Sequence, residues 1–148
     1  MMGKLLPPSY FFGALLLAVV LHFLPPGYQL LTFPWRLLGL APLVIGIVLN
    51  VLADQAFKKY ATSVKPFEKS STLVTGGVFR VTRNPMYLGM ILILFGVAML
   101  LGSASPFVAV PPLVALLDRV FIAPEEHMLE DTFGERFLQY RKPVRRWI

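Results

Sequence analysis

The 148-residue sequence contains no cysteine. Without cysteine the chain has no disulfide framework, no thiol nucleophile and no thiolate metal site. Histidine is also scarce, and His22 and His127 stand in different contexts without partners at ligand spacing. Because a metal site needs several convergent ligands, we expect both histidines to be structural and no metal to bind.

Charged residues are also few. Charged residues make up 15% of the chain and hydrophobic residues 56%, whereas soluble domains average about 25% and about 45–50%. A soluble protein of this length could not hide so much apolar surface, but lipid covers the outside of a membrane bundle. The length suits one domain. We therefore predict a single all-α domain, residues 1–148, that forms a polytopic integral membrane helical bundle.

Long apolar runs supply the helices of this bundle. A membrane span needs about 20 residues, with a range of about 17–25. Four segments qualify once their neutral flanks are included, although Pro111-Pro112 interrupts the last: residues 10–24, 35–53, 86–101 and 106–123. We predict about four transmembrane helices, two in residues 10–53 and two in residues 54–148.

Basic residues indicate the orientation. Six of the 14 Lys and Arg residues fall in residues 54–83 and six in residues 119–148. Basic clusters at membrane boundaries predict cytoplasmic loops rather than a nucleic-acid partner. With four spans, the N-terminus, the 54–83 loop and the C-terminal tail share the cytoplasmic side of what we expect to be a cell inner membrane. The last two spans then form a hairpin that returns Arg83-Asn84 and Glu125-Glu126 to one surface.

Small residues repeat at a spacing of seven within two of the spans. Gly39, Gly46 and Ala53 lie on one face of the second helix, and Gly89 and Gly96 repeat the spacing in the third. Small residues let helix backbones approach closely in lipid. We expect these faces to serve helix packing rather than ligand binding.

The pattern changes after Pro124. Leu129, Phe133 and Phe137 share one helical face, opposite a charged face. This spacing predicts a C-terminal amphipathic helix that lies on the membrane surface or closes over the hairpin.

Residues 72–87 read TLVTGGVFRVTRNPMY and combine a Gly-Gly turn, two arginines and a helix start. Asn before Pro is a favourable helix N-cap, and Arg80 and Arg83 are long enough to reach the membrane interface, which makes a purely structural interpretation reasonable. The same residues also suit an anion cradle, because free N–H groups and the helix dipole favour negative charge. The sequence leaves both interpretations open.

The acidic pair Glu125-Glu126 follows Pro124 at the end of the fourth apolar segment. Paired carboxylates at a membrane boundary are costly unless they are solvated or have partners. Acidic residues after proline suit a solvated helix start. Alternatively, the pair accepts hydrogen bonds from the hydroxyl groups or the cation of a ligand. By itself this cluster does not distinguish the two interpretations.

In combination, the two clusters resemble the isoprenylcysteine carboxyl methyltransferase family and its phospholipid-methylating relatives. The resemblance covers residues 57–147 and rests on the order LVTGGVFRxxRNPMY, an apolar hairpin, Glu125-Glu126 and FGERFxxYR. It implies methyl transfer from S-adenosylmethionine bound at the cytoplasmic end of the hairpin. It also implies cofactor contacts from Ser71, Thr72, Leu73, Val74, Phe79, Asn84, Pro85, Met86, Tyr87 and Glu125.

Two positions depart from the family's pattern. Eukaryotic members usually have histidine where this chain has Asn84, which can hydrogen-bond but cannot titrate like imidazole. A substrate-side arginine of the family falls at Phe121, and we expect the nearby Arg119 to take its place. The chain also lacks a G-x-G-x-x-G fingerprint, which argues against a dinucleotide-type cofactor site.

The expected reaction is in-line displacement at the sulfonium methyl group by a lipophilic, lipid or prenylated acceptor that arrives from the membrane. A carboxylate acceptor needs alignment in a dry site more than acid–base help. An amine acceptor needs a base, for which Glu126 is the first choice. Arg83, Tyr87 and Glu126 are the predicted catalytic residues. Three alternatives stay open: a phospholipid or lipid-amine N-methyltransferase, an NADPH-dependent sterol-reductase-like enzyme and a non-enzymatic membrane protein.

Overall fold

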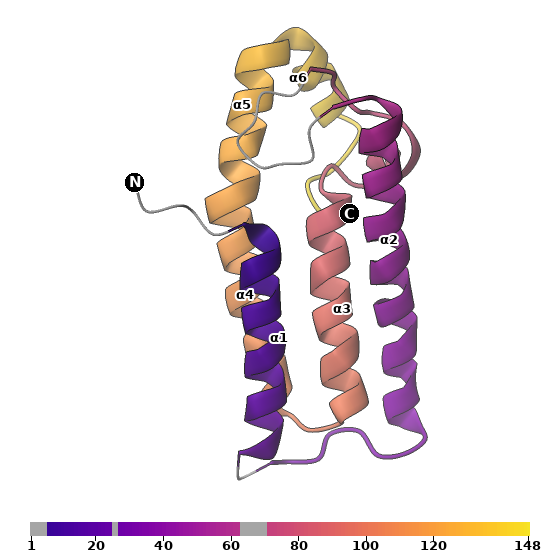
Figure 1. Ribbon diagram of the computed structural model, residues 1–148, viewed down its shortest axis with the longest axis vertical. Coiled ribbons are helices and arrows are strands. Elements are labelled where there is room, and N and C mark those ends of the chain that lie inside the picture. Colours follow the sequence, from indigo (N-terminus) through magenta and orange to yellow (C-terminus); the bar gives the residue numbers. More distant parts are fainter. Residues whose placement is uncertain (1–5, 25–26, 63–70) are drawn as a thin grey trace.

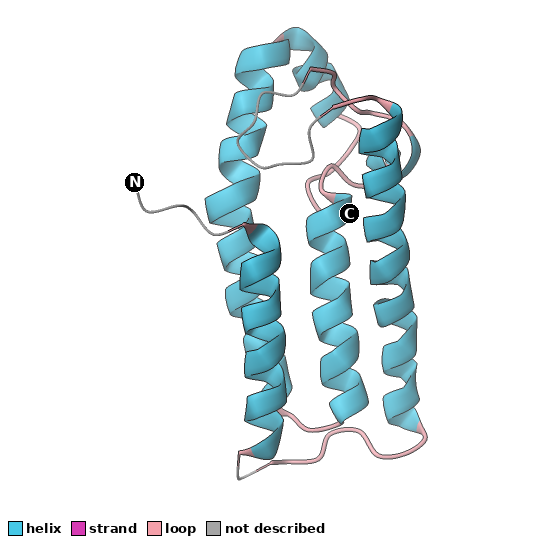
Figure 2. Cartoon of the chain, viewed as in Figure 1, coloured by secondary structure: helices cyan, strands magenta, loops and turns pink. Residues whose placement is uncertain are grey.

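The computed structural model describes residues 6–24, 27–62 and 71–148, and within these ranges the regular elements are helices (Figure 2). Lys4, Pro25-Pro26 and the middle of the predicted basic loop lie outside the described residues. The α-helices are α1 (Pro7–Phe23), α2 (Leu40–Lys59), α3 (Pro85–Leu101), α4 (Val110–Leu116), α5 (Ala123–Phe133) and α6 (Glu135–Arg141). Short 3₁₀ segments cover Trp35–Gly39, Gly77–Arg80 and Ser105–Ala109. The all-α prediction is confirmed for the described part of the chain.

The long helices alternate in direction along one bundle axis (Figure 1). In that view α1 and α3 run downward, whereas α2 and the α4–α5 helix run upward. The upper end therefore gathers the end of α2, the start of α3, α5, α6 and the C-terminus. The predicted hairpin geometry is confirmed, because the start of α3 and the acidic pair on α5 lie at the same end of the bundle.

Two helices are long and apolar enough to cross a membrane. They cover Trp35–Lys59 and Ser105–Phe133, with mean hydropathies of 2.1 and 1.7. The apolar helices α1 and α3 have 17 residues each, at the short limit of about 17–25 residues for a span. The second long helix has 29 residues, more than the about 20 that a bilayer core needs, so its last turns extend beyond the other helices (Figure 1).

Helices α2 and α3 touch backbone to backbone along the predicted small-residue faces. A Cβ added to Gly39 would lie 2.5 Å from the Gly96 carbonyl oxygen, and one added to Gly46 would lie 2.5 Å from the Gly89 carbonyl oxygen. Ala53 is fully buried further along the same face. The packing role predicted for these residues is confirmed.

The helix that contains the fourth apolar segment continues through Pro124, where the sequence predicted the start of a separate amphipathic helix. Leu117–Ile122 form a π-helical turn in which the Ala123 N–H donates to the Asp118 carbonyl, five residues back. Proline lacks an N–H and its ring clashes with the carbonyl four residues back, so the widened turn before it relieves both conflicts. The expectation of a boundary at Pro124 was wrong, and the acidic pair lies on a continuous helix.

The predicted single amphipathic helix at the C-terminus was also wrong, because it is two helices. Gly134 separates α5 from α6 with φ +52° and ψ −125°, a backbone conformation that residues with a Cβ rarely adopt. Phe137 of α6 is almost fully buried. The turn at Gly134 thus folds α6 back toward the end of the hairpin.

Candidate functional site

The start of α3 is anchored on the C-terminal tail. Asn84 occupies the N-cap position, but its side chain makes no capping hydrogen bond; its Nδ2 donates to the Arg146 carbonyl at 3.0 Å. The backbone N–H of Asn84 donates to Thr82 Oγ1 at 3.1 Å, and Pro85 is fully buried. Of the two interpretations that the sequence left open, the side-chain cap is not formed, because the Asn84 amide instead connects α3 to a segment about 60 residues away.

Arg83 and Glu126 form a buried ion pair between the two predicted clusters. Arg83 Nε donates to Glu126 Oε1 at 3.0 Å, and Arg83 Nη2 lies 2.8 Å from the same oxygen. The two side chains are only 10% and 9% exposed. Arg83 Nη1 also donates to the carbonyls of Arg141 and Val144. The predicted anion cradle thus already holds an anion of the protein itself.

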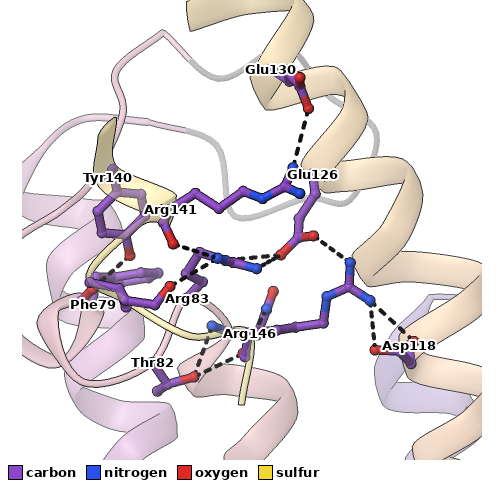
Figure 3. A network of polar contacts seen from close by, with 11 residues as sticks. Phe79, Thr82, Arg83, Asp118, Glu126, Glu130, Tyr140, Arg141 and Arg146 are labelled. Atoms are coloured by element: carbon purple, nitrogen blue, oxygen red, sulfur yellow. Dashed lines mark hydrogen bonds and ion pairs between the residues drawn. The ribbon is translucent and has the colours of Figure 1, made fainter. Parts of the chain in front are cut away.

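Arg146 extends this pair into a network of four charged side chains (Figure 3). Arg146 Nη2 donates to Glu126 Oε2 at 2.5 Å, and Arg146 Nη1 lies 3.1 and 3.3 Å from the two carboxylate oxygens of Asp118. The hydrogen bond from Arg146 to Glu126 raises the pKa of this guanidinium above its usual value. Asp118 and Arg146 were missed at the sequence level. An acid within an apolar membrane segment needs a partner, which is the signal that Asp118 offered.

Tyr87 and Glu125 connect the two clusters a second time. The Tyr87 hydroxyl donates to Glu125 Oε1 at 2.6 Å. Tyr87 is buried, and its ring lies 6.3 Å from that of Phe121, which in turn meets Tyr10 of α1 edge to face at 5.7 Å. Glu125 is half-buried. The two neighbouring acids therefore point at different partners, Glu125 at a tyrosine and Glu126 at two arginines.

The segment before α3 reaches the same end of the bundle through apolar packing. Val74 and Phe79 are buried in a cluster with Ala53, and Met86 and Tyr140 pack against it. The Tyr140 hydroxyl donates to the Phe79 carbonyl at 2.6 Å, and burial raises the pKa of Tyr140 to about 12. The side chains of Val74 and Phe79 hence serve the core of this end of the molecule.

The other predicted site residues differ in exposure. Ser71 and Thr72 are exposed and Leu73 is half-buried, so this part of the segment faces outward from the cluster. Arg119 is exposed and forms no ion pair with another residue of the described ranges. The structure thus brings Arg83, Tyr87 and the acidic pair together and leaves Arg119 outside their network.

Comparisons with known proteins agree on one family. The family model described as "Phospholipid methyltransferase" matches residues 35–136. A protein-S-isoprenylcysteine O-methyltransferase of Schizosaccharomyces pombe is 35% identical over 97 residues, which cover 64% of this chain and 39% of that protein. Protein-S-isoprenylcysteine O-methyltransferase A of Arabidopsis thaliana is 28% identical over 137 residues, which cover 86% of this chain and 70% of that protein. An uncharacterized Haemophilus influenzae protein is 35% identical over 63 residues, its full length and 43% of this chain.

A solved structure shares the fold. The eukaryotic intramembrane Ras methyltransferase, an isoprenylcysteine carboxyl methyltransferase, superposes with a TM-score of 0.71 at 25% identity, covering 95% of this chain and 52% of that one. The chain therefore spans about half of that enzyme. These relatives fit the methyltransferase prediction better than the reductase or non-enzymatic alternatives. On the matched model, the relatives and the shared fold, this chain belongs to the phospholipid methyltransferase family, together with the isoprenylcysteine carboxyl methyltransferases.

Proposed function

We propose that the protein is an integral membrane methyltransferase that uses S-adenosylmethionine to methylate a lipophilic acceptor, in the manner of a carboxyl O-methyltransferase. One observation supports this most strongly. The Tyr87–Glu125 hydrogen bond and the Arg83–Glu126 ion pair join the two family-like clusters at one end of the hairpin. The cofactor and the acceptor would meet there.

The residues present suit a cationic cofactor with hydroxyl groups. Two carboxyl groups, those of Asp118 and Glu126, meet the guanidinium groups of Arg83 and Arg146, and a third, that of Glu125, accepts from the Tyr87 hydroxyl. Glu125 is the acid whose hydrogen bond comes from a tyrosine rather than an arginine, so its carboxylate keeps capacity to accept from ligand hydroxyl groups. When bound, S-adenosylmethionine supplies an electrophilic methyl group on a positively charged sulfur.

In this proposal the predicted cofactor contacts gather at one end of the bundle. Tyr87 orients Glu125, and Pro85 and Asn84 fix the start of α3 beside it. The outward part of the preceding segment and the backbone near the buried Val74 and Phe79 complete the site. The ten positions are Ser71, Thr72, Leu73, Val74, Phe79, Asn84, Pro85, Met86, Tyr87 and Glu125. Arg119, exposed at the π-helical turn, remains our candidate for the acceptor.

The chemistry requires alignment and exclusion of water more than proton transfer. The rings of Tyr87 and Phe121 are buried beside one another next to Glu125, which would help to exclude water from the reacting atoms. Glu126 has both carboxylate oxygens engaged by guanidinium groups. This geometry favours a role in positioning, with Glu126 acting as a base only if the acceptor is an amine.

The proposal includes a topology of four spanning helices with the site on the cytoplasmic side of a cell inner membrane. A 17-residue helix is about 26 Å long at 1.5 Å per residue, which the uncharged flanks of α1 and α3 extend toward a bilayer core of about 30 Å. Basic residues gather at the end that carries the site, and these support the cytoplasmic assignment: Lys58, Lys59, Arg80, Lys142 and Arg145.

An N-methyltransferase acting on a phospholipid or lipid amine is the second candidate. The matched family model carries the description of a phospholipid methyltransferase, and a carboxylate without an arginine partner would suit a cationic acceptor. The products separate the two candidates. A radiolabelled methyl group released by mild alkali indicates a methyl ester, whereas a label that stays in the extracted lipid indicates N-methylation.

Binding of the cofactor tests the proposal itself. We expect S-adenosylmethionine and its demethylated product to raise the melting temperature of the detergent-purified protein and to give a calorimetric binding isotherm. Glu125→Ala should weaken that binding at least tenfold, whereas the matched control Glu135→Ala, at an exposed position of α6, should bind like the wild type. Stabilisation by NADPH and not by S-adenosylmethionine would overturn the proposal in favour of a reductase.

A further inference from the structure

The C-terminal strap, which we define as residues 141–147, holds the approach to α3 through its backbone. The Arg146 carbonyl accepts from Thr82 Oγ1 at 3.2 Å and from Asn84 Nδ2 at 3.0 Å. The carbonyls of other strap residues accept from Arg83, which donates through its backbone N–H and through Nη1. Three consecutive residues before α3 are thus bonded to main-chain oxygens of the strap.

Apolar side chains fix the strap on both sides of Arg146. Val144 is 7% exposed. Trp147 packs against the hydrophobic cluster that includes Tyr87 and Phe121. Because burial of apolar side chains stabilises a segment whatever its secondary structure, these anchors keep residues 144–147 against the bundle even though they are outside any helix.

The Arg146 side chain joins elements that no other residue of the strap joins within the described ranges. It binds Asp118 in the π-helical turn and Glu126 in the first turn of α5. Glu126 in turn receives Arg83 on its other carboxylate oxygen. A planar guanidinium can serve two carboxylates at once through its separate N–H groups, which the single ammonium of lysine cannot do in the same geometry.

We propose that the C-terminal strap forms one wall of the cofactor site and that Arg146 is its positioning residue. Arg146 acts through two connections: its side chain sets the orientation of Glu126 beside Glu125, and its carbonyl sets the position of Asn84 at the start of α3. This inference rests on the proposed function, because it assigns the strap to the same site.

Three variants test the role of Arg146: Arg146→Ala, Arg146→Lys and the matched control Arg136→Ala. Arg136 is an arginine of α6 outside the strap, and its side chain is exposed. The measurements are the Kd of S-adenosylmethionine by calorimetry, and KM and kcat for transfer of a radiolabelled methyl group from S-adenosylmethionine to a lipid extract. We expect Arg146→Ala to raise the Kd and KM for S-adenosylmethionine at least fivefold with kcat within threefold of the wild type. The Kd and KM of Arg146→Lys should fall between those of Arg146→Ala and the wild type, and Arg136→Ala should match the wild type.

A purely structural role gives a different result. Partial unfolding lowers the fraction of active protein, and therefore the apparent kcat, without changing Kd or KM. An Arg146→Ala variant with a wild-type Kd overturns the inference, whatever its kcat. If this variant does not fold, Arg146→Lys decides: a Kd at least twofold above wild type supports the inference, and an unchanged Kd overturns it. Absence of binding by the wild type overturns the proposed function itself, a result distinct from either outcome.

Discussion

Helix α3 is held in two different ways along its length. Its middle meets α2 through glycines whose backbones touch, with Gly46 facing Gly89. Its start is held by charged and polar side chains, above all the Arg83–Glu126 pair and the Asn84 contact with the C-terminal strap. The middle lacks charge and depends on shape, which suits lipid. The start depends in addition on charges that must be paired.

This difference indicates where a ligand can be admitted. At the glycines of the α2–α3 contact an added Cβ meets backbone atoms of the other helix, so nothing can be inserted there. In the polar network, carboxylates and guanidinium groups have further hydrogen-bonding capacity that a ligand can use, although removing one partner of a buried pair is costly. A site that must admit and release a cofactor belongs in the second kind of region.

The largest effect is expected from Arg83→Ala. It leaves Glu126 buried with Arg146 alone and removes the donor to two strap carbonyls. Breaking a buried ion pair from one side costs about 3–5 kcal/mol. Reversible unfolding in mixed micelles should show a loss of this size, whereas the exposed neighbour in Arg80→Ala should change stability by less than about 0.5 kcal/mol. Equal losses in the two variants would show that the network does not hold α3.

Gly46→Leu should destabilise the protein by about 3 kcal/mol, the upper part of the usual range for overpacking. The new Cβ would lie 2.5 Å from the Gly89 carbonyl oxygen, so the helices have to separate. Gly13→Leu is the matched control on α1, where a Cβ meets nothing within 4 Å. Melting temperatures of the two variants in one detergent give the comparison, and a tolerated leucine at position 46 would contradict the packing.

Tyr140→Phe should cost about 1 kcal/mol, because it removes the hydrogen bond to the Phe79 carbonyl and keeps the ring. The pKa of Tyr140 is raised to about 12 in the folded protein. A raised pKa means that the folded state favours the neutral phenol, so this contribution is complete below about pH 10, the unfolded value, and declines as pH approaches 12. The difference in unfolding free energy between Tyr140→Phe and the wild type should therefore be constant between pH 7 and 9. A difference that shrinks in that interval would contradict the raised pKa of Tyr140.

The smallest effect is expected at an exposed ion pair of α2. Lys58 Nζ lies 2.6 Å from Asp54 Oδ2, but the side chains are 73% and 40% exposed. Such pairs on a helix contribute about 0.3–0.5 kcal/mol and are screened by salt. Lys58→Ala should leave the unfolding free energy within about 0.5 kcal/mol of wild type, measured at low and at high salt. A loss near that of Arg83→Ala would remove the distinction between exposed and buried charge.

The helix packing could be predicted from the sequence, whereas much of the polar network could not. A spacing of seven residues places small side chains on one face whatever the rest of the chain does, so Gly39 and Gly46 were assigned to packing correctly. The meeting of the two clusters followed from the hairpin, since both clusters flank it, but the pairing of Arg83 with Glu126 and of Tyr87 with Glu125 was not predicted. Arg146 belongs to the network only because the C-terminal tail folds back over the start of α3. No local sequence pattern predicts that fold-back.

Two boundaries were mispredicted for related reasons. Proline at position 124 is a helix breaker by local rules, but the π-helical turn before it absorbs the conflict. The apolar spacing of Leu129, Phe133 and Phe137 suggested one helix, but Gly134 allows a backbone turn that keeps Phe137 buried in α6. In both cases a local backbone irregularity, which the residue pattern does not report, decided the boundary.

A double-mutant cycle on S-adenosylmethionine binding tests the central claim most directly. The variants are Tyr87→Phe, Glu125→Gln and their combination, with the dissociation constant of each measured by calorimetry. If α3 and α5 form one cofactor site through this pair, the two effects are coupled by about 1 kcal/mol or more, and the double variant binds better than the product of the single losses implies. Additivity within about 0.3 kcal/mol would mean that the two residues act independently, and it would contradict a single site at this end of the hairpin.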